Sequence, residues 1–227
     1  MAEAYAELLA TEGTTRGLIG PRESARLWER HLLNCAVVTD LVPDGSRLAD
    51  IGSGAGLPGV VLAIRRPDLR VTLVEPLLRR TRFLDEAVAH LGLDNVEVRR
   101  GRAEELAGSA TFDVVTSRAV APLPRLLGWS LPLVHAGGAV LAMKGGSAAE
   151  EVLAAAPDLE RWGSPPTDVV VLGTTVIDPP TTVVRVRVEA STVLGWSPQS
   201  STARRPGAAR RAQQRGGRRR GHHGSGA

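Results

Sequence analysis

The sequence predicts an α/β protein with a doubly wound, mostly parallel seven-stranded sheet and a group of N-terminal helices. Candidate strands and helices alternate along most of the chain, a pattern typical of a parallel sheet. Strands such as residues 71–74 are apolar at consecutive positions, as expected for a sheet covered on both faces. A glycine-rich turn at residues 52–59 joins the first strand to a helix, a connection common in such sheets.

The first 45 residues predict a helical cap. Apolar residues recur at helical spacing in residues 3–10 and 22–41, and Pro21 suits the start of a helix. A main domain should then span residues 46–190. Within it we expect strands at 47–51, 70–75, 95–99, 112–117 and 138–143, and helices at 58–66, 77–91, 123–135 and 148–156.

The last strands differ in character from the earlier ones. Residues 169–172 and 183–188 flank a turn at Asp178-Pro-Pro180, which predicts an antiparallel hairpin closing the sheet. From residue 191 to 227 the chain is rich in Ser, Pro, Gly and Arg and poor in large apolar residues. We expect this tail to be disordered.

The composition indicates a soluble, cytoplasmic protein. Hydrophobic residues make up 43% of the chain, and no apolar run approaches the roughly 20 residues of a membrane span. The N-terminus is acidic, unlike a secretory signal. Cys35 is the single cysteine, which excludes an internal disulfide and a cysteine metal cluster.

The net charge of +4 hides an uneven distribution. Residues 201–227 hold eight arginines and no acid, so the remaining 20 basic residues face 24 acids and the body carries −4. A nucleic-acid surface on the body must therefore be a local patch. The tail is either a dispensable extension or a tether to nucleic acid.

The turn Asp50-Ile-Gly-Ser-Gly-Ala-Gly-Leu-Pro-Gly59 fits two cofactors. Its second half, Gly54–Gly59, matches the dinucleotide pattern GxGxxG. Its first half matches the Asp-x-Gly-x-Gly-x-Gly loop of S-adenosylmethionine (SAM) methyltransferases. The carboxylate of Asp50 would repel a pyrophosphate, whereas SAM carries a cationic amino group and a sulfonium. This favours SAM.

Every expected strand of the parallel sheet ends in polar or glycine-rich sequence. In an open α/β sheet, ligands bind beyond the carboxyl ends of the strands, so these ends should form one site. An acid at the second strand end, Glu75, suits the two ribose hydroxyls of an adenosyl cofactor. The ends are Asp50–Gly56, Glu75, Gly101–Glu104, Thr116–Ala119 and Met143–Gly146.

Six motifs resemble those of the RsmG (GidB) family of bacterial 16S rRNA guanine-N7 methyltransferases. They lie at residues 27–36, 50–59, 75–80, 101–104, 117–119 and 142–145, within a resemblance that runs from Arg22 to Arg187. The resemblance implies a class I SAM-dependent methyltransferase with a Rossmann-like fold. It also implies 16S rRNA or the 30S subunit as partner; we expect a monomer that needs neither metal nor membrane.

The resemblance also implies a set of cofactor contacts, to which the loop chemistry adds Asp50 and Gly54. The contacts that it implies are Gly52, Leu57, Glu75, Pro76, Leu77, Ala103, Glu104 and Arg118.

Arg118 and Lys144 are the candidates for positioning the substrate. The guanidinium of Arg118 is suited to the SAM carboxylate, an RNA phosphate or the base. Lys144 is the single lysine among 28 Lys and Arg residues, so its position favours a compact ammonium over a planar fork. No general base is expected, because guanine N7 carries an in-plane lone pair and no proton.

Other features leave alternatives open. Trp28 and His31 contact RNA or belong to the core, and the run Arg79-Arg80-x-Arg82 binds phosphate or forms a solvated helix face. Thr116–Ala119 lacks the (Asp/Asn)-Pro-Pro-aromatic motif of amine methylation. The alternative functions are methylation of another RNA or a small molecule, and RNA binding without catalysis.

Overall fold

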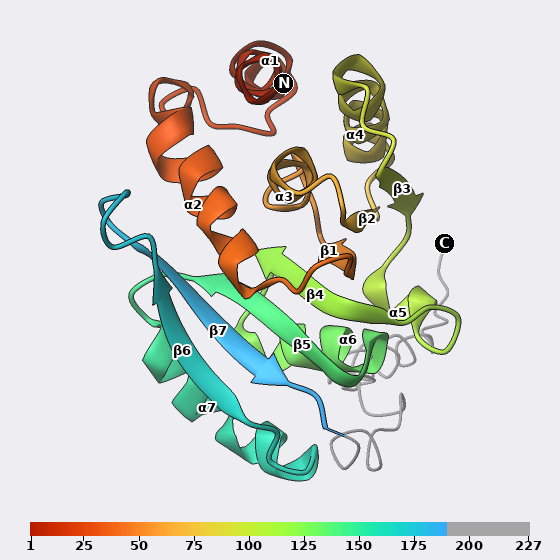
Figure 1. Ribbon diagram of the computed structural model, residues 1–227, viewed down its shortest axis with the longest axis vertical. Helices are drawn as coiled ribbons and strands as arrows, with labels where there is room; N and C mark the ends of the chain where they lie inside the picture. The colour runs from red at the N-terminus through yellow and green to blue at the C-terminus, as the bar shows by residue number, and fades with distance from the viewer. Residues whose placement is uncertain (190–227) are drawn as a thin grey trace, which may run out of the picture. The chain divides into compact units, whose positions relative to one another are not determined.

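The computed structural model describes residues 1–189 and places seven strands in one sheet (Figure 1). Their order is β3-β2-β1-β4-β5-β7-β6, and only β7 runs antiparallel to its neighbours β5 and β6. This confirms the predicted doubly wound sheet. The predicted disordered tail lies outside the described residues. The strands are β1 (Arg47–Ile51), β2 (Arg70–Glu75), β3 (Val96–Arg100), β4 (Phe112–Arg118), β5 (Val134–Lys144), β6 (Thr167–Leu172) and β7 (Thr181–Arg187).

Helices cover both faces of the sheet, and each face has its own buried apolar cluster. The N-terminal helices share one cluster with α3 and α4, so Tyr5, Leu32 and Phe83 belong to the same core. None of the helices in residues 1–189 is long and apolar enough to cross a membrane. The helices are α3 (Gly59–Arg65) and α4 (Leu78–Leu91) on one face and α5 (Ala103–Leu106), α6 (Leu123–Ser130) and α7 (Ala148–Arg161) on the other.

The N-terminal helices are less regular than predicted. Helix α1 (Ala2–Leu8) continues as a π-helical turn to Gly13. The predicted helix 22–41 begins with a 3₁₀ turn and a π-helical turn (Trp28–Leu32), then becomes α2 (Leu33–Ala36) and ends in a second 3₁₀ turn. The wide π turn brings Leu27 and Leu32, five residues apart, into the core together, with 3% and 4% of their surfaces exposed.

Three other boundaries differ from the prediction by four residues or more. The predicted helix 123–135 ends at Ser130, because the 3₁₀ turn Leu131–Leu133 contains Pro132 and leads directly into β5. Strand β5 consequently starts four residues before its predicted first residue, 138. Helix α7 continues past exposed Pro157 to Arg161, where burial of Leu159 offsets the backbone hydrogen bond that proline cannot make.

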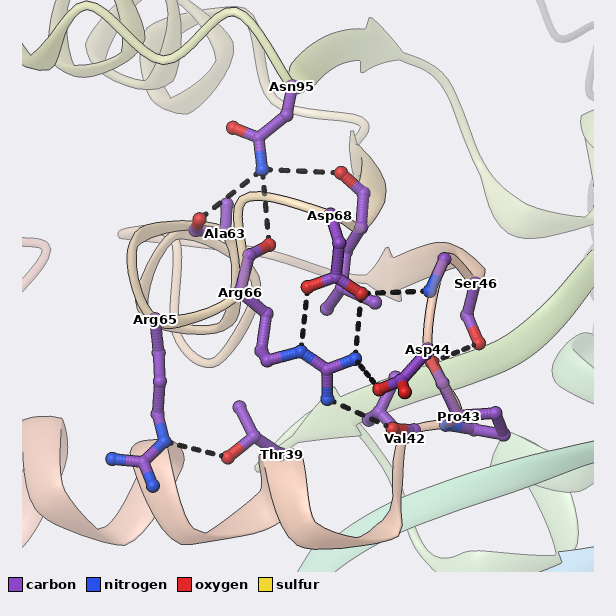
Figure 2. Close-up of polar contacts among 12 residues, drawn as sticks. Thr39, Val42, Pro43, Asp44, Ser46, Ala63, Arg65, Arg66, Asp68 and Asn95 are labelled. Carbon is purple, nitrogen blue, oxygen red and sulfur yellow. Dashed lines mark hydrogen bonds and ion pairs between the residues drawn. The ribbon is translucent and has the colours of Figure 1, made fainter.

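A polar network fixes the amino-terminal ends of β1 and β2 (Figure 2). The guanidinium of Arg66 donates to the carboxylates of Asp44 and Asp68 and to the carbonyl of Val42, at 2.6–3.2 Å. The amide of Asn95 donates to three carbonyl oxygens at 3.2–3.4 Å. These contacts join the end of the N-terminal helices to the loops after α3 and α4, at the edge of the sheet opposite the ligand-binding end.

The predicted hairpin is confirmed, and β7 rather than β6 pairs with β5. The start of β7 contacts the N-terminal helices, because the hydroxyl of Thr181, its first residue, donates to the carbonyl of Asn34 at 3.0 Å. This contact places the start of β7 beside α2, next to the carboxyl end of β5.

Candidate cofactor and substrate site

Two neighbouring cavities lie at the carboxyl ends of the strands. The smaller, about 370 Å³, is bounded by the segments that follow β1, β2 and β3. The larger, about 960 Å³, lies between the end of β5, the N-terminal helices and the hairpin turn. Ala119 and Val120, which follow β4, line both cavities. A ligand that spans both must therefore pass this pair of residues.

The structure brings most predicted site residues to these two cavities. Asp50 in β1 and Gly54 and Leu57 in the glycine loop line neither cavity in the described part of the chain. The larger cavity receives Arg118 and Lys144. The smaller receives Gly52, Glu75, Pro76, Leu77, Ala103 and Glu104.

The glycine loop needs residues without a Cβ. Gly52 has a φ of +70°, and a Cβ there would lie 2.8 Å from Cγ2 of Val120. Gly56 has a φ of +96°, and a Cβ there would lie 2.8 Å from the hydroxyl of Tyr5. That hydroxyl donates to the carbonyl of Ala55 at 2.7 Å. Helix α1 thus supports the loop from behind, a role for Tyr5 that no local sequence signal indicated.

Asp50 supports the loop from beneath. Its carboxylate is fully buried, and Oδ2 accepts a hydrogen bond from the backbone N–H of Gly59 at 3.0 Å, at the start of α3. Within residues 1–189, Oδ1 has no hydrogen-bond partner. Burial raises the pKa of Asp50 to about 7. A nearby cation stabilises the charged form of a buried carboxyl group whose pKa is raised. This property is expected of an acid close to the ammonium of SAM.

Glu75 joins the loop to the smaller cavity. Its side chain is 1% exposed; Oε2 accepts from the N–H of Gly54 and Oε1 from the N–H of Leu77, both at 3.0 Å. A carboxylate has about four lone-pair positions, so each oxygen retains one for a ribose hydroxyl. The apolar side chains of Leu77 and Ala103 line the same cavity and suit an adenine ring. The residues present therefore fit an adenosyl cofactor.

Arg118 is held by the N-terminal helices. Its guanidinium contacts Nδ1 of His31, and Nε2 of His31 lies 3.0 Å from the carboxylate of Glu23. Burial and the nearby Arg118 lower the pKa of His31. The lowered pKa favours the neutral ring, in which Nδ1 accepts from Arg118 and Nε2 donates to Glu23. Trp28, in the same helical segment, is 43% exposed.

Lys144 is engaged by other residues of the chain. Its ammonium donates to the carbonyl of Ala121 at 2.8 Å and to the carboxylate of Glu151 at 2.7 Å, and its side chain is 10% exposed. Neither Glu23 nor Glu151 was predicted as a site residue, since each meets its partner only through the tertiary fold.

The sheet order, the glycine loop after β1 and the acid at the end of β2 define a class I SAM-dependent methyltransferase. Solved structures agree on the fold. A methyltransferase from Pyrococcus furiosus matches 66% of this chain and 78% of its own with a TM-score of 0.53 at 15% identity. Trm5b from Pyrococcus abyssi matches 75% of this chain and 50% of its own, with a TM-score of 0.52 at 16% identity.

Sequence comparison identifies the family. The family model described as "GidB: rRNA small subunit methyltransferase G" matches residues 1–175. A ribosomal RNA small subunit methyltransferase G from Nocardioides sp. is 60% identical over 93% of this chain and 84% of its own length. One from Thermobifida fusca is 57% identical over 91% of this chain and 88% of its own. The chain belongs to the GidB (RsmG) family.

Replacing Asp50 with Asn should change how the stability of the cofactor-free protein depends on pH. A carboxyl whose pKa is higher in the folded than in the unfolded state contributes stability at low pH and loses it as the pH rises. Between about pH 4 and pH 7, the wild type should lose on the order of 2–4 kcal/mol of unfolding free energy that Asp50→Asn does not lose. Urea denaturation across this pH range measures the difference in unfolding free energy. If the free energies of the wild type and Asp50→Asn change with pH in parallel, the raised pKa of Asp50 is contradicted.

Replacing Glu75 with Ala should weaken SAM binding by about 10- to 100-fold, since it removes an acceptor that orders Gly54 and Leu77 and faces the cavity. Glu75→Gln keeps one acceptor oxygen and should lose less. Titration calorimetry measures both affinities. Glu97→Ala, at an exposed acid on β3, serves as the control. Equal SAM affinity in all three variants would rule out a cofactor role for Glu75.

Proposed function

We propose that this protein transfers the methyl group of SAM to N7 of a guanine in 16S rRNA, as free RNA or within the 30S subunit. Family membership supports the reaction and the substrate. The observation that carries the proposal is the pair of adjoining cavities, one suited to an adenosyl group and one large enough for a base, meeting at Ala119 and Val120.

Methyl transfer to N7 requires the nitrogen, the methyl group and the sulfur to be aligned, and it requires no proton transfer. SAM supplies an electrophilic methyl group on a sulfonium. The in-plane lone pair of N7 forms the new N–C bond while the S–C bond breaks and its electron pair stays on sulfur. N7 carries no proton, so the protein has no proton to remove. Its contribution is to hold the reactants in line, which is worth about 7–11 kcal/mol in favourable cases.

Each site residue then has a role of its own. The proposed cofactor contacts are those of the smaller cavity, with Glu75 on the ribose and Ala103 and Glu104 beside the adenine. Asp50 shapes the glycine loop through the N–H of Gly59, and its buried charge acts on the ammonium of SAM through the loop, since Asp50 itself lines neither cavity. Arg118 projects into the larger cavity, where it faces the SAM carboxylate or the incoming nucleotide.

The beginning of α4 offers contacts for the RNA backbone. Arg80 lies against Glu75 at 3.6 Å and lines the smaller cavity. Arg79 and Arg82 instead line a separate hollow with Arg16, outside the cofactor site. This division predicts that Arg79 and Arg82 meet phosphates of the bound RNA. The arginine-rich tail, the other candidate for RNA contact, lies outside the described residues.

A variant with both Arg79→Ala and Arg82→Ala should raise the KM for the ribosomal substrate at low salt and leave SAM affinity unchanged. Two lost phosphate contacts should reduce the slope of log KM against log salt by roughly 1.4. Kinetics at several salt concentrations measure this slope. Arg161→Ala, on α7 at the other face of the sheet, should keep the wild-type slope. An unchanged slope in the double variant would leave these arginines as a solvated helix face.

Mass spectrometry of 16S rRNA tests the function directly. RNA from cells that lack the gene should miss one N7-methylguanosine, and purified protein with SAM should restore it on naked 16S rRNA or on 30S subunits. The substrate on which methylation is restored, naked 16S rRNA or the 30S subunit, is the methyl acceptor of the enzyme. An unchanged methylation pattern together with SAM binding would favour a different RNA or a small molecule as substrate. Binding of RNA without methyl transfer would favour a non-catalytic role.

A further inference from the structure

The two cavities share Ala119 and Val120, the first half of a four-residue segment, Ala119–Pro122, whose second half lines the larger cavity alone. Ala119 has a φ of +54°, a left-handed conformation that residues other than glycine adopt only where neighbours impose it. Val120 lies against Gly52 of the glycine loop, where a Cβ on Gly52 would come within 2.8 Å of its side chain. The position of this segment therefore sets the width of the junction between the cofactor cavity and the substrate cavity.

The far end of the segment is held by Lys144 and Glu151. The ammonium of Lys144 donates to the carbonyl of Ala121 at 2.8 Å and to Oε2 of Glu151 at 2.7 Å. The same Oε2 accepts from the N–H of Leu123 at 2.9 Å, at the start of α6. The side chains of Lys144 and Glu151 are 10% and 25% exposed, so the pair is less screened by water than a surface ion pair.

The near end of the segment is held independently. Arg118 precedes Ala119 and is fixed by His31, which in turn contacts Glu23. Charged side chains thus anchor the segment at both ends. A compact ammonium with three donors reaches a carbonyl and a carboxylate in different directions, which the planar fork of arginine does less well. This accounts for a lysine at position 144 in a chain that otherwise uses arginine.

We propose that Lys144 and Glu151 act as one unit that positions the Ala119–Pro122 segment against the glycine loop and so sets the junction through which the methyl group passes. The proposal rests on the proposed methyltransferase function. It differs from a direct substrate contact by Lys144 because it assigns an equal role to Glu151. Direct contact requires Lys144 alone.

A double-mutant cycle separates the two roles. The variants are Lys144→Met, Glu151→Gln and the combination. Each single variant should raise the Kd for SAM and lower the single-turnover rate of methyl transfer, each by about tenfold, since each releases the same segment. In both readouts, the combined variant should be no more impaired than the more impaired of the two single variants. This is the result expected for residues that act as a unit.

The control is the ion pair Arg185–Asp168 between β6 and β7, joined at 2.7 Å, with side chains 29% and 36% exposed. Arg185→Met and Asp168→Asn should leave both readouts unchanged, and thermal melts identify any variant that has not folded. If Lys144→Met does not fold, Glu151→Gln against Glu151→Asp carries the test, with the aspartate partly restoring SAM affinity.

Multiplicative effects in the combined variant, or a silent Glu151→Gln beside an impaired Lys144→Met, would overturn the proposal. The SAM measurement needs no RNA. A wild type that binds SAM but does not methylate 16S rRNA would therefore refute the proposed function without affecting this test.

Discussion

Two buried carboxylates hold the glycine loop on which the site depends. Asp50 at the end of β1 binds the N–H of Gly59, and Glu75 at the end of β2 binds the N–H of Gly54. The backbone N–H groups of Gly52 and Ser53 both lie within hydrogen-bonding distance of the carbonyl of Val74. The loop is therefore connected at several points to two adjacent parallel strands. Because both acids are buried, the energy of these contacts is sensitive to any opposite charge brought close to the loop.

The same constraint explains why the N-terminal helices belong to the enzyme's core. The hydroxyl of Tyr5 contacts the backbone of the glycine loop. His31, which contacts Glu23, holds Arg118 at the larger cavity. The residues of these helices are packed in one apolar cluster with α3, α4 and the sheet. Loss of the first helix would therefore expose apolar surface and remove a support of the cofactor loop at once.

The sequence predicts the parts of this site that follow from local patterns, and it does not predict those that depend on contacts between distant residues. The strand ends were predictable because parallel strands bring their carboxyl ends to one edge, and Gly52, Glu75 and Ala103 line the cavity expected there. The residues that support the loop and Arg118 from the N-terminal helices were not predictable. Tyr5 meets a carbonyl 50 residues away, and His31 meets a guanidinium 87 residues away, so no spacing or motif connects them. The irregular helices were missed for a related reason, since a π turn is selected by core packing and not by helix propensity.

The distribution of charge suits a reaction that moves a positive charge without creating one. The sulfonium loses its charge as the guanine ring gains it, so the total charge at the junction is the same before and after methyl transfer. The residues at the junction, Gly52, Ala119 and Val120, are uncharged. Of the charged residues around it, Glu75 and Asp50 support the loop, the Lys144–Glu151 pair contacts the backbone of the adjoining segment, and Arg118 lines the larger cavity. A wall of uncharged side chains held by outlying ion pairs favours alignment over proton transfer, which is what attack by an unprotonated N7 requires.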